Sequence, residues 1–278
     1  MDIRQVQSAW EANAAAWVRL SQMGCDVLRD LVNTPAFLAM LPPVAGSRGL
    51  DLGCGDGHNT RLVAQRGARM TAIDLTPTFL AYACRAEREA AHGITYGMAD
   101  AARLPFADAS FDFAIAVMSL MDMPAHERVL AEVYRVLRIG GFLQFSICHP
   151  CFATPRWEWL RDEQGRRDAL VCGEYFRDLH GEVEEWMFST APPELQCILP
   201  KFRMPRFTRT LSSWLNLLMA TGFSLEHFDE PSADAALVQQ HPEVADTRLI
   251  AYILIIRCRK PARSTAYSGV DGGCSTKG

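Results

Sequence analysis

The chain has 278 residues, of which 49% are hydrophobic and 22% charged, a composition typical of globular proteins. Its length fits one large domain or a core domain with an inserted subdomain. The formal net charge of −4, from 28 Lys and Arg against 32 Asp and Glu, excludes the basic footprint of a protein that binds nucleic acid or anionic lipid.

Residues 1–45 are predicted to be helical, because Trp10, Trp17 and the apolar residues around them recur near helical spacing. We interpret both tryptophans as the buried face of a helix, although a helix that closes over a cationic ligand would use such rings as well. Segment 9–20 contains charged residues, which argues against a signal peptide and a membrane span. Nine cysteines without a secretory signal favour reduced thiols, so we expect a cytoplasmic protein with no membrane partner.

Residues 48–148 alternate between short apolar runs and helical segments. Such apolar runs are typical of strands buried on both faces of a parallel sheet. A helix is expected to start after Thr76, with Pro77 in its first position and Gly93 at its left-handed end, and a second helix covers 126–141 up to its two glycines. The alternation indicates a doubly wound α/β fold. The expected strands are 48–53, 69–75, 94–100, 111–119 and 142–148.

The regular pattern fails after the fifth strand. Residues 151–207 combine many aromatics and prolines with scattered charges, and we interpret them as an insertion over the ligand edge of the sheet. The pattern returns with a helix at 209–222 and strands at 223–230 and 248–258. Residues 262–278, rich in Ser, Gly and Thr, are predicted to form a disordered tail.

A glycine-rich turn follows the first strand. Gly53, Gly55 and Gly57 let the backbone turn sharply and approach a ligand, and the next helix offers free N–H groups. A dinucleotide fingerprint would need a small residue where His58 or Thr60 stands. The turn therefore argues against a nicotinamide cofactor.

An acidic residue, Asp74, ends the second strand. A carboxylate there can accept charge-assisted hydrogen bonds from ribose hydroxyls. The alternative is that Asp74 only caps the following helix, and the neighbouring glycines favour the ribose role.

Four successive stretches, GLDLGCGDGHNT, TAIDLTPTFLAYA, GMADAARLPFADASFDFAIAVMS and EVYRVLRIGGFLQFSI, resemble the ordered motifs of class I S-adenosylmethionine-dependent methyltransferases. The resemblance covers about residues 45–147 and is closest to small-molecule enzymes similar to the ubiquinone and menaquinone C-methyltransferases. It implies S-adenosylmethionine as cofactor and S-adenosylhomocysteine as product. The implied fold is α/β, a doubly wound seven-stranded, mainly parallel sheet of the Rossmann-like methyltransferase type, ending in an antiparallel strand pair.

The same resemblance implies a set of cofactor-binding residues. Asp51 would lie near the methionine amino group, Asp74 would hold the ribose and Asp100 the adenine amino group. Ala101 would give a backbone contact and Met118 would line the cofactor side of the cleft. The full set is Asp51, Gly53, Gly55, Gly57, Asp74, Asp100, Ala101 and Met118.

The sequence departs from this branch on the substrate side. Asp122 and Met123 stand where the branch often has a pair of histidines, and the insertion 151–207 lies outside the shared motifs. Both departures leave the identity of the acceptor open.

The stretch ICHPC ends the fifth strand at the same crevice. A structural zinc needs four ligands, and Cys148 and Cys151 have no second close pair, so we expect no metal and interpret both thiols as packing residues. His149 is a candidate general base, since its pKa suits proton removal near neutral pH. An equally weighted alternative is that His149 bonds the backbone and fixes the loop.

The sequence thus predicts methyl transfer from S-adenosylmethionine to a small, aromatic or otherwise hydrophobic acceptor, without a nucleic-acid partner. The expected organisation is a helical lid (1–45), a cofactor-binding core (46–150 and 208–261) and a substrate cap (151–207), followed by the tail. Two alternatives are a catalytically silent S-adenosylmethionine-binding module and a nicotinamide-dependent oxidoreductase.

Overall fold

The computed structural model describes residues 1–262. Apart from Ala262, the tail that we expect to be disordered lies outside the described residues.

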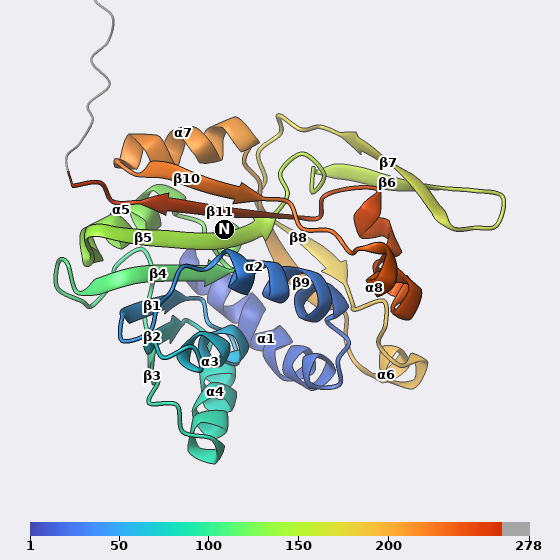
Figure 1. Ribbon diagram of the computed structural model, residues 1–278. Helices are drawn as coiled ribbons and strands as arrows, with labels where there is room; N and C mark the ends of the chain where they lie inside the picture. Colours follow the sequence, from blue (N-terminus) through green and yellow to red (C-terminus); the bar gives the residue numbers. More distant parts are fainter. Residues whose placement is uncertain (263–278) are drawn as a thin grey trace, which may run out of the picture.

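A seven-stranded sheet forms the centre of the molecule, with the strand order β10-β11-β5-β4-β1-β2-β3 (Figure 1). Strand β11 runs antiparallel to both of its neighbours, β5 and β10, and the other paired strands are parallel. This confirms the predicted doubly wound, mainly parallel sheet with an antiparallel pair at its end. The strands are β1 (Arg48–Leu52), β2 (Arg69–Asp74), β3 (Thr95–Met98), β4 (Phe111–Val117), β5 (Leu137–Cys148), β10 (Ser224–Asp229) and β11 (Ile253–Arg259).

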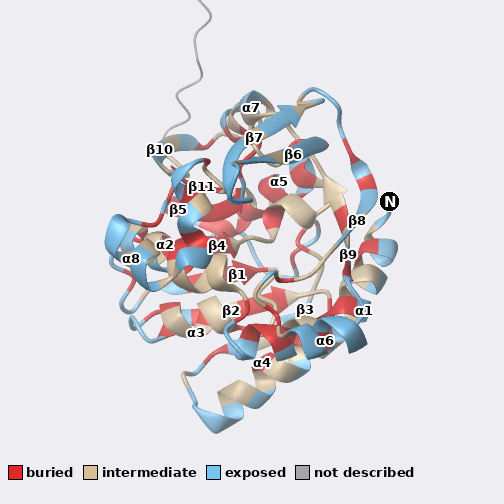
Figure 2. Cartoon of the chain, turned by 90° about the vertical axis from the view of Figure 1, so that its right-hand side faces the viewer, coloured by how far each residue is buried: buried red, intermediate tan, exposed pale blue. Residues whose placement is uncertain are grey.

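Helices cover both faces of the sheet, and a hydrophobic core lies on each face. One core packs α5 (His126–Val136) and α7 (Leu211–Thr221) on the central strands. The other packs α2 (Thr34–Met40) and α3 (His58–Ala64) on the opposite face. Figure 2 shows the strands buried between these layers. Burial on both faces explains why the strand sequences are apolar runs rather than alternating patterns.

Several element boundaries differ from the sequence prediction, most clearly at α5 and β11. Helix α5 ends at Val136, and its expected last turn already belongs to β5. Gly140 has a φ of 79°, and its N–H donates to Lys260 O at 2.8 Å, so the pairing with the chain beyond β11 replaces a helical bond. Strand β11 begins at Ile253, because the 3-10 turn Pro242–Arg248 takes up the start of the expected strand.

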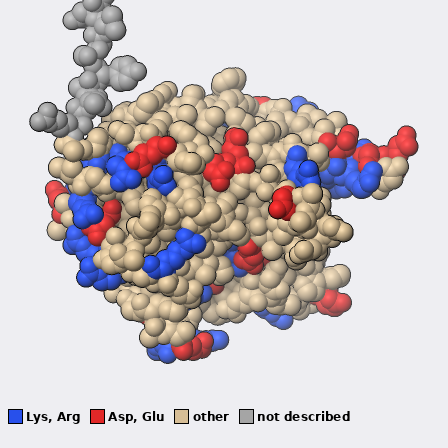
Figure 3. Space-filling model, viewed as in Figure 1, with Lys and Arg blue, Asp and Glu red and all other residues tan. Residues whose placement is uncertain are grey.

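The insertion consists of two hairpins and a short helix. Strands β6 (Arg156–Arg161) and β7 (Arg167–Gly173) form a hairpin that reaches away from the sheet (Figure 1), and its surface is largely exposed (Figure 2). Acidic and basic side chains are interspersed along it in the view of Figure 3. Strands β8 (His180–Trp186) and β9 (Phe202–Phe207) flank α6 (Pro193–Ile198) and form the second hairpin.

The N-terminal helix α1 (Ile3–Gln22) joins this second hairpin to the sheet. The Asn13 amide donates to Arg203 O and accepts from Arg203 N, both at 3.0 Å, which pairs the helix with β9. Trp17 packs on aromatic rings of the hairpin, with centroids 4.8 to 5.5 Å apart. Because these partners are far apart in the sequence, the spacing of residues could not predict the contact. The ring partners of Trp17 are Trp186, Phe188 and Phe202.

On its other side, α1 is fastened to the start of α4 (Pro77–Glu89). The Gln7 amide donates to Leu75 O at 2.7 Å. The Glu11 carboxylate accepts from the backbone N–H of Thr78 at 3.2 Å and from its hydroxyl at 2.5 Å. A carboxylate at a helix N-terminus satisfies free N–H groups and the helix dipole. We call these contacts of Gln7 and Glu11 the α1 latch.

The remaining helical elements are the π-helical turn Arg29–Asn33, the 3-10 turn Leu120–Asp122 and α8 (Ala235–Gln240). Within residues 1–262, every helix is too short or too polar to cross a membrane.

Candidate active site

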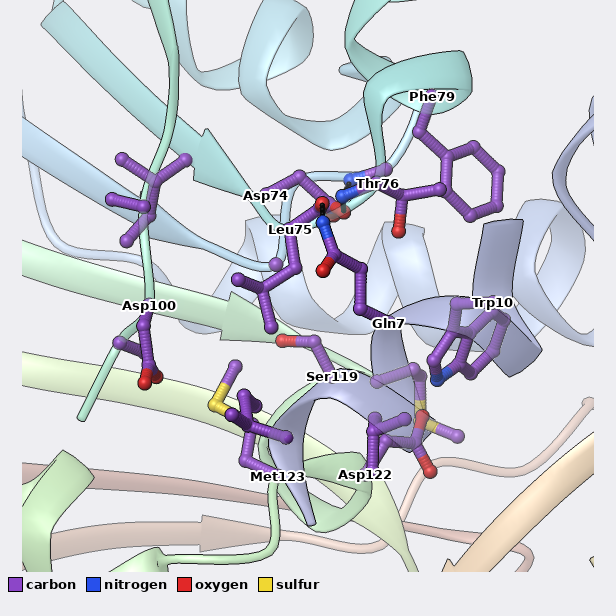
Figure 4. A pocket seen from close by; sticks show the side chains of 18 residues that line it. Gln7, Trp10, Asp74, Leu75, Thr76, Phe79, Asp100, Ser119, Asp122 and Met123 are labelled. Atoms are coloured by element: carbon purple, nitrogen blue, oxygen red, sulfur yellow. Dashed lines mark hydrogen bonds between the residues drawn. The ribbon is translucent and has the colours of Figure 1, made fainter.

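A cavity lies at the carboxyl ends of β1, β2 and β4, where α1 closes over them (Figure 4). Ligands of open α/β sheets bind at this edge. Asp74 and Asp100 lie toward one end, which we call the Asp74 end. Asp122 lies beside Trp10 at the other, which we call the Asp122 end.

Most of the sequence-predicted cofactor residues line this cavity together: Gly53, Gly55, Asp74, Asp100, Ala101 and Met118. Asp51, Gly57 and His149 are not among its lining residues within the described chain. The lining residues on α1 were not predicted from the sequence, apart from the possible role of the Trp10 ring. The spacing of these residues predicted a helix, but it could not predict that the helix covers the cavity. The missed α1 residues are Ile3, Val6 and Gln7.

The glycine turn fits closely against the loop after β4. Gly53 has a φ of 69°, and a Cβ at this position would lie 2.6 Å from Ser119 Cβ. The Ser119 hydroxyl donates to Leu52 O at 2.6 Å, which fixes the two loops together. Gly55 has a φ of 56°, and no atom lies within 4 Å of where its Cβ would be, so open space faces it. A side chain would be strained at both positions and would fill that space at Gly55.

Asp74 is held by the backbone at the end of β2. Its Oδ2 accepts from Gly55 N at 2.9 Å and its Oδ1 from Thr76 N at 2.8 Å. Burial raises the pKa of this carboxyl, and the backbone hydrogen bonds oppose the shift. A carboxylate has about four acceptor positions. The contacts with Gly55 and Thr76 leave positions for the hydroxyls of a ligand.

Asp51 faces the protein rather than the cavity. It is 2% exposed, and the Thr60 hydroxyl donates to its Oδ2 at 2.5 Å. Burial raises its pKa to about 7, and the bond from Thr60 opposes that rise. This contact fastens the end of β1 to α3, and the proposed role near a methionine amino group stays a prediction.

Asp100 and Met118 flank the cavity from the loops after β3 and β4. Asp100 Oδ1 accepts from Ala102 N at 2.8 Å, and within residues 1–262 its Oδ2 has no hydrogen-bond partner. Met118 has a φ of 53°, and its N–H donates to Ser146 O at 3.0 Å. A non-glycine residue in this conformation stores strain, which is common where a side chain is directed into a functional site.

At the Asp122 end, a carboxyl and a thiol lie close together under β9. Burial raises the pKa of Asp122 to about 8, and the positive charge of Arg206 opposes the shift. Burial, reinforced by the charge of Asp122, raises the pKa of the Cys148 thiol to about 12. Cys148 is exposed, so it is not the buried packing residue that we expected.

His149 lies apart from the cavity, with partners on both ring nitrogens. It is 3% exposed, and its Nε2 lies 2.7 Å from Glu230 Oε1. Its Nδ1 accepts from Cys151 N at 3.2 Å. These are the contacts of a residue that fixes the loop, and the role of general base stays a prediction. No group of three metal-binding side chains occurs among residues 1–262.

The comparisons with known proteins agree with this geometry. Residues 50–145 match the family described as a methyltransferase domain. The chain is 38% identical to demethylmenaquinone methyltransferase of Tropheryma whipplei over 166 residues, which cover 57% of this chain and 68% of that protein. It is 37% identical to malonyl-[acyl-carrier protein] O-methyltransferase of Pectobacterium atrosepticum over 126 residues, 44% of this chain and 48% of the relative. The match thus spans about half the length of that second relative.

A solved structure gives a broader match. An S-adenosylmethionine-dependent methyltransferase from Mesorhizobium loti superposes with a TM-score of 0.65 at 30% identity, covering 81% of this chain and 96% of that one. The chain belongs to the S-adenosylmethionine-dependent methyltransferases. The predicted family and cofactor are thereby confirmed.

Proposed function

We propose that the protein transfers a methyl group from S-adenosylmethionine to a small acceptor with a hydrophobic, aromatic body. The observation that supports this most is that a single cavity contains both the glycine turn with Asp74 and Asp100, and the pair Trp10 and Asp122. The first set suits the cofactor, and the second suits an apolar acceptor with one polar atom.

The residues of the Asp74 end fit this cofactor. The unused acceptor positions of Asp74 suit the ribose hydroxyls, and Asp100 Oδ2 suits the amino group of adenine. Gly55 leaves the open space that a ligand close to the backbone requires. Bound S-adenosylmethionine supplies a methyl group that is already electrophilic.

The chain contributes alignment and the exclusion of water. Helix α1 closes the cavity with an apolar face, and the Trp10 ring is available to a cationic centre. We propose that the segments have the roles expected from the sequence: residues 1–45 form a lid, 46–150 and 208–261 the cofactor-binding core, and 151–207 the substrate cap. The β8–β9 hairpin, which packs on α1, supports the last of these roles.

Calorimetry with S-adenosylhomocysteine and NAD tests the cofactor. We expect binding of the first and none of the second, and NAD binding with no affinity for the first would instead favour an oxidoreductase. Methyl transfer is tested with methyl-labelled S-adenosylmethionine and four probes: 1-naphthol, 1,4-naphthalenediol, dodecanoic acid and malonyl-[acyl-carrier protein]. The last follows the name of one relative. Labelled product from an aromatic probe supports the proposal, whereas tight cofactor binding with no product from any probe favours a silent binding module.

A further inference from the structure

The Asp122 end contains a carboxyl group that no described protein group engages. Asp122 belongs to the 3-10 turn directly after β4 and lines the cavity beside Trp10 and Met123 (Figure 4). Within residues 1–262, no hydrogen bond reaches its side-chain oxygens. The acids at the other strand ends differ, since Asp74 has two backbone donors and Asp100 has one. Asp122 is half-buried and faces the cavity, so a ligand bound there can supply the hydrogen-bond partner that the protein does not.

The charged and titratable groups around Asp122 are few. Arg206, from β9, is the cation that opposes its raised pKa, but its guanidinium is also paired with Glu184 of β8 at 3.1 Å. Cys148, from β5, stays protonated at neutral pH because its pKa is about 12. His126, from α5 behind the turn, is neutral, because burial and the charge of Arg209 lower its pKa to about 4.

We propose that Asp122 accepts a hydrogen bond from a hydroxyl group of the acceptor and removes its proton as the methyl group is transferred. The inference rests on the proposed function and narrows it to acceptors with a hydroxyl nucleophile on an apolar body. A base is needed for a hydroxyl more than for an amine, because a neutral amine already offers a free lone pair. An ordinary aspartate with a pKa of about 4 is a weak base for a phenolic proton of pKa about 10, and a raised pKa brings the two closer.

The step balances in atoms and charge. The hydroxyl proton goes to the Asp122 carboxylate, the oxygen lone pair forms the new O–CH3 bond, and the S–CH3 bond breaks with its electrons left on sulfur. The methyl donor is the one named in the proposed function. Before transfer the cavity holds a sulfonium and a carboxylate, and afterwards it holds a thioether and a neutral carboxyl. The sulfonium favours the ionised form of Asp122 and its loss favours the protonated form, so the pKa changes in the direction that the reaction needs.

The protonated state of Cys148 serves the same step. The thiolate, not the thiol, is the nucleophilic form of cysteine. Burial and the neighbouring Asp122 keep this thiol protonated, so it does not compete with the acceptor for the methyl group.

The first test measures binding to the complex with S-adenosylhomocysteine at about pH 8.5, above the pKa of about 8 so that Asp122 is mainly ionised, using 1-naphthol and 1-methoxynaphthalene. The two probes differ in the hydroxyl hydrogen that Asp122 would accept. We expect 1-naphthol to bind about tenfold more tightly or better, as for one hydrogen bond to a charged group. This preference should vanish in Asp122→Leu and persist in Asp108→Leu, a control at an exposed position in the loop before β4. The absence of a preference in the parent, including failure of 1-naphthol to bind, or survival of the preference in Asp122→Leu, overturns the inference.

The second test follows the carboxyl itself by 13C NMR with labelled aspartate, assigned with Asp122→Asn. The pKa should be lower in the complex with S-adenosylmethionine than in the complex with S-adenosylhomocysteine, and equal values contradict the inference. The proposed function and the role of Asp122 can be refuted separately. If the parent binds neither S-adenosylmethionine nor S-adenosylhomocysteine, the proposed function is refuted. If it binds S-adenosylhomocysteine but shows no preference for the hydroxyl probe, only the role of Asp122 is refuted.

Discussion

The two ends of the cavity are built in different ways. The Asp74 end comes from one continuous stretch of the chain, and backbone N–H groups hold its acids in place. The Asp122 end is lined by α1 and the turn after β4, with β5 and β9 packed against that turn, and its acid has no hydrogen-bond donor among residues 1–262. The first arrangement suits a ligand that stays the same, such as the cofactor. In the second, the acceptor would be recognised by segments whose sequence can vary without disturbing the sheet.

The largest effect is expected where α1 meets the hairpin, because that contact holds the Asp122 end together. Trp17→Ala should lower the free energy of unfolding by about 3–5 kcal/mol, as for the loss of a large aromatic side chain from a core. Urea denaturation gives the value. Trp157→Ala, at a position on β6 that is 44% exposed, is the matched control and should stay within about 1 kcal/mol of the parent. Equal losses in both variants would mean that α1 is not anchored by this cluster.

At the Asp74 end, Asp74→Ala should weaken S-adenosylhomocysteine binding roughly tenfold to a hundredfold, because the ribose hydroxyls lose a charged acceptor. Calorimetry on the variant, shown to be folded by circular dichroism, measures the change. Asp168→Ala, a control at an exposed position of β7, should bind like the parent. An unchanged dissociation constant for the Asp74 variant would remove this end of the cavity from the cofactor site.

His149 is the competing candidate for the general base. If Asp122 takes the proton, His149→Ala leaves the preference for 1-naphthol intact and reduces turnover by less than about tenfold, through disturbance of the loop. A positioned base is worth about a hundredfold or more. A loss of that size in His149→Ala, together with loss of the rising limb of the pH–rate profile, would return the role to the histidine.

The last effect concerns the dependence of stability on pH at the Asp122 end. Burial raises the pKa of Asp122 from 3.8 to about 8, so the folded chain binds more protons than the unfolded chain between these values. The unfolding free energy therefore falls as pH rises through this range. Asp122→Asn removes that dependence, so its stability relative to the parent should increase from about pH 4 to about pH 8. Denaturation at several pH values checks this, and a constant difference would show that Asp122 titrates normally.

The sequence was informative where structure and ligand contacts are local. The glycine turn and Asp74 lie at strand ends, and a buried parallel strand has a recognisable apolar pattern. Arg206 gave no signal, because its partner Glu184 and its neighbour Asp122 reach it only through the fold of the insertion. The end of α5 was misplaced because the preference of Leu137 for the helix is overridden by its pairing with Phe111 in β4.

The α1 latch also affects the association and dissociation rates of ligands. Because Gln7 and Glu11 fasten the helix over the cavity, we expect ligand exchange to require that the helix first releases Leu75 O and Thr78. The observed rate of S-adenosylhomocysteine association should then level off at high ligand concentration, at the rate of helix opening. A weakened latch, as in Glu11→Gln, should increase the association rate and the dissociation rate by similar factors. The residence time of the ligand should then shorten, with little change in its dissociation constant.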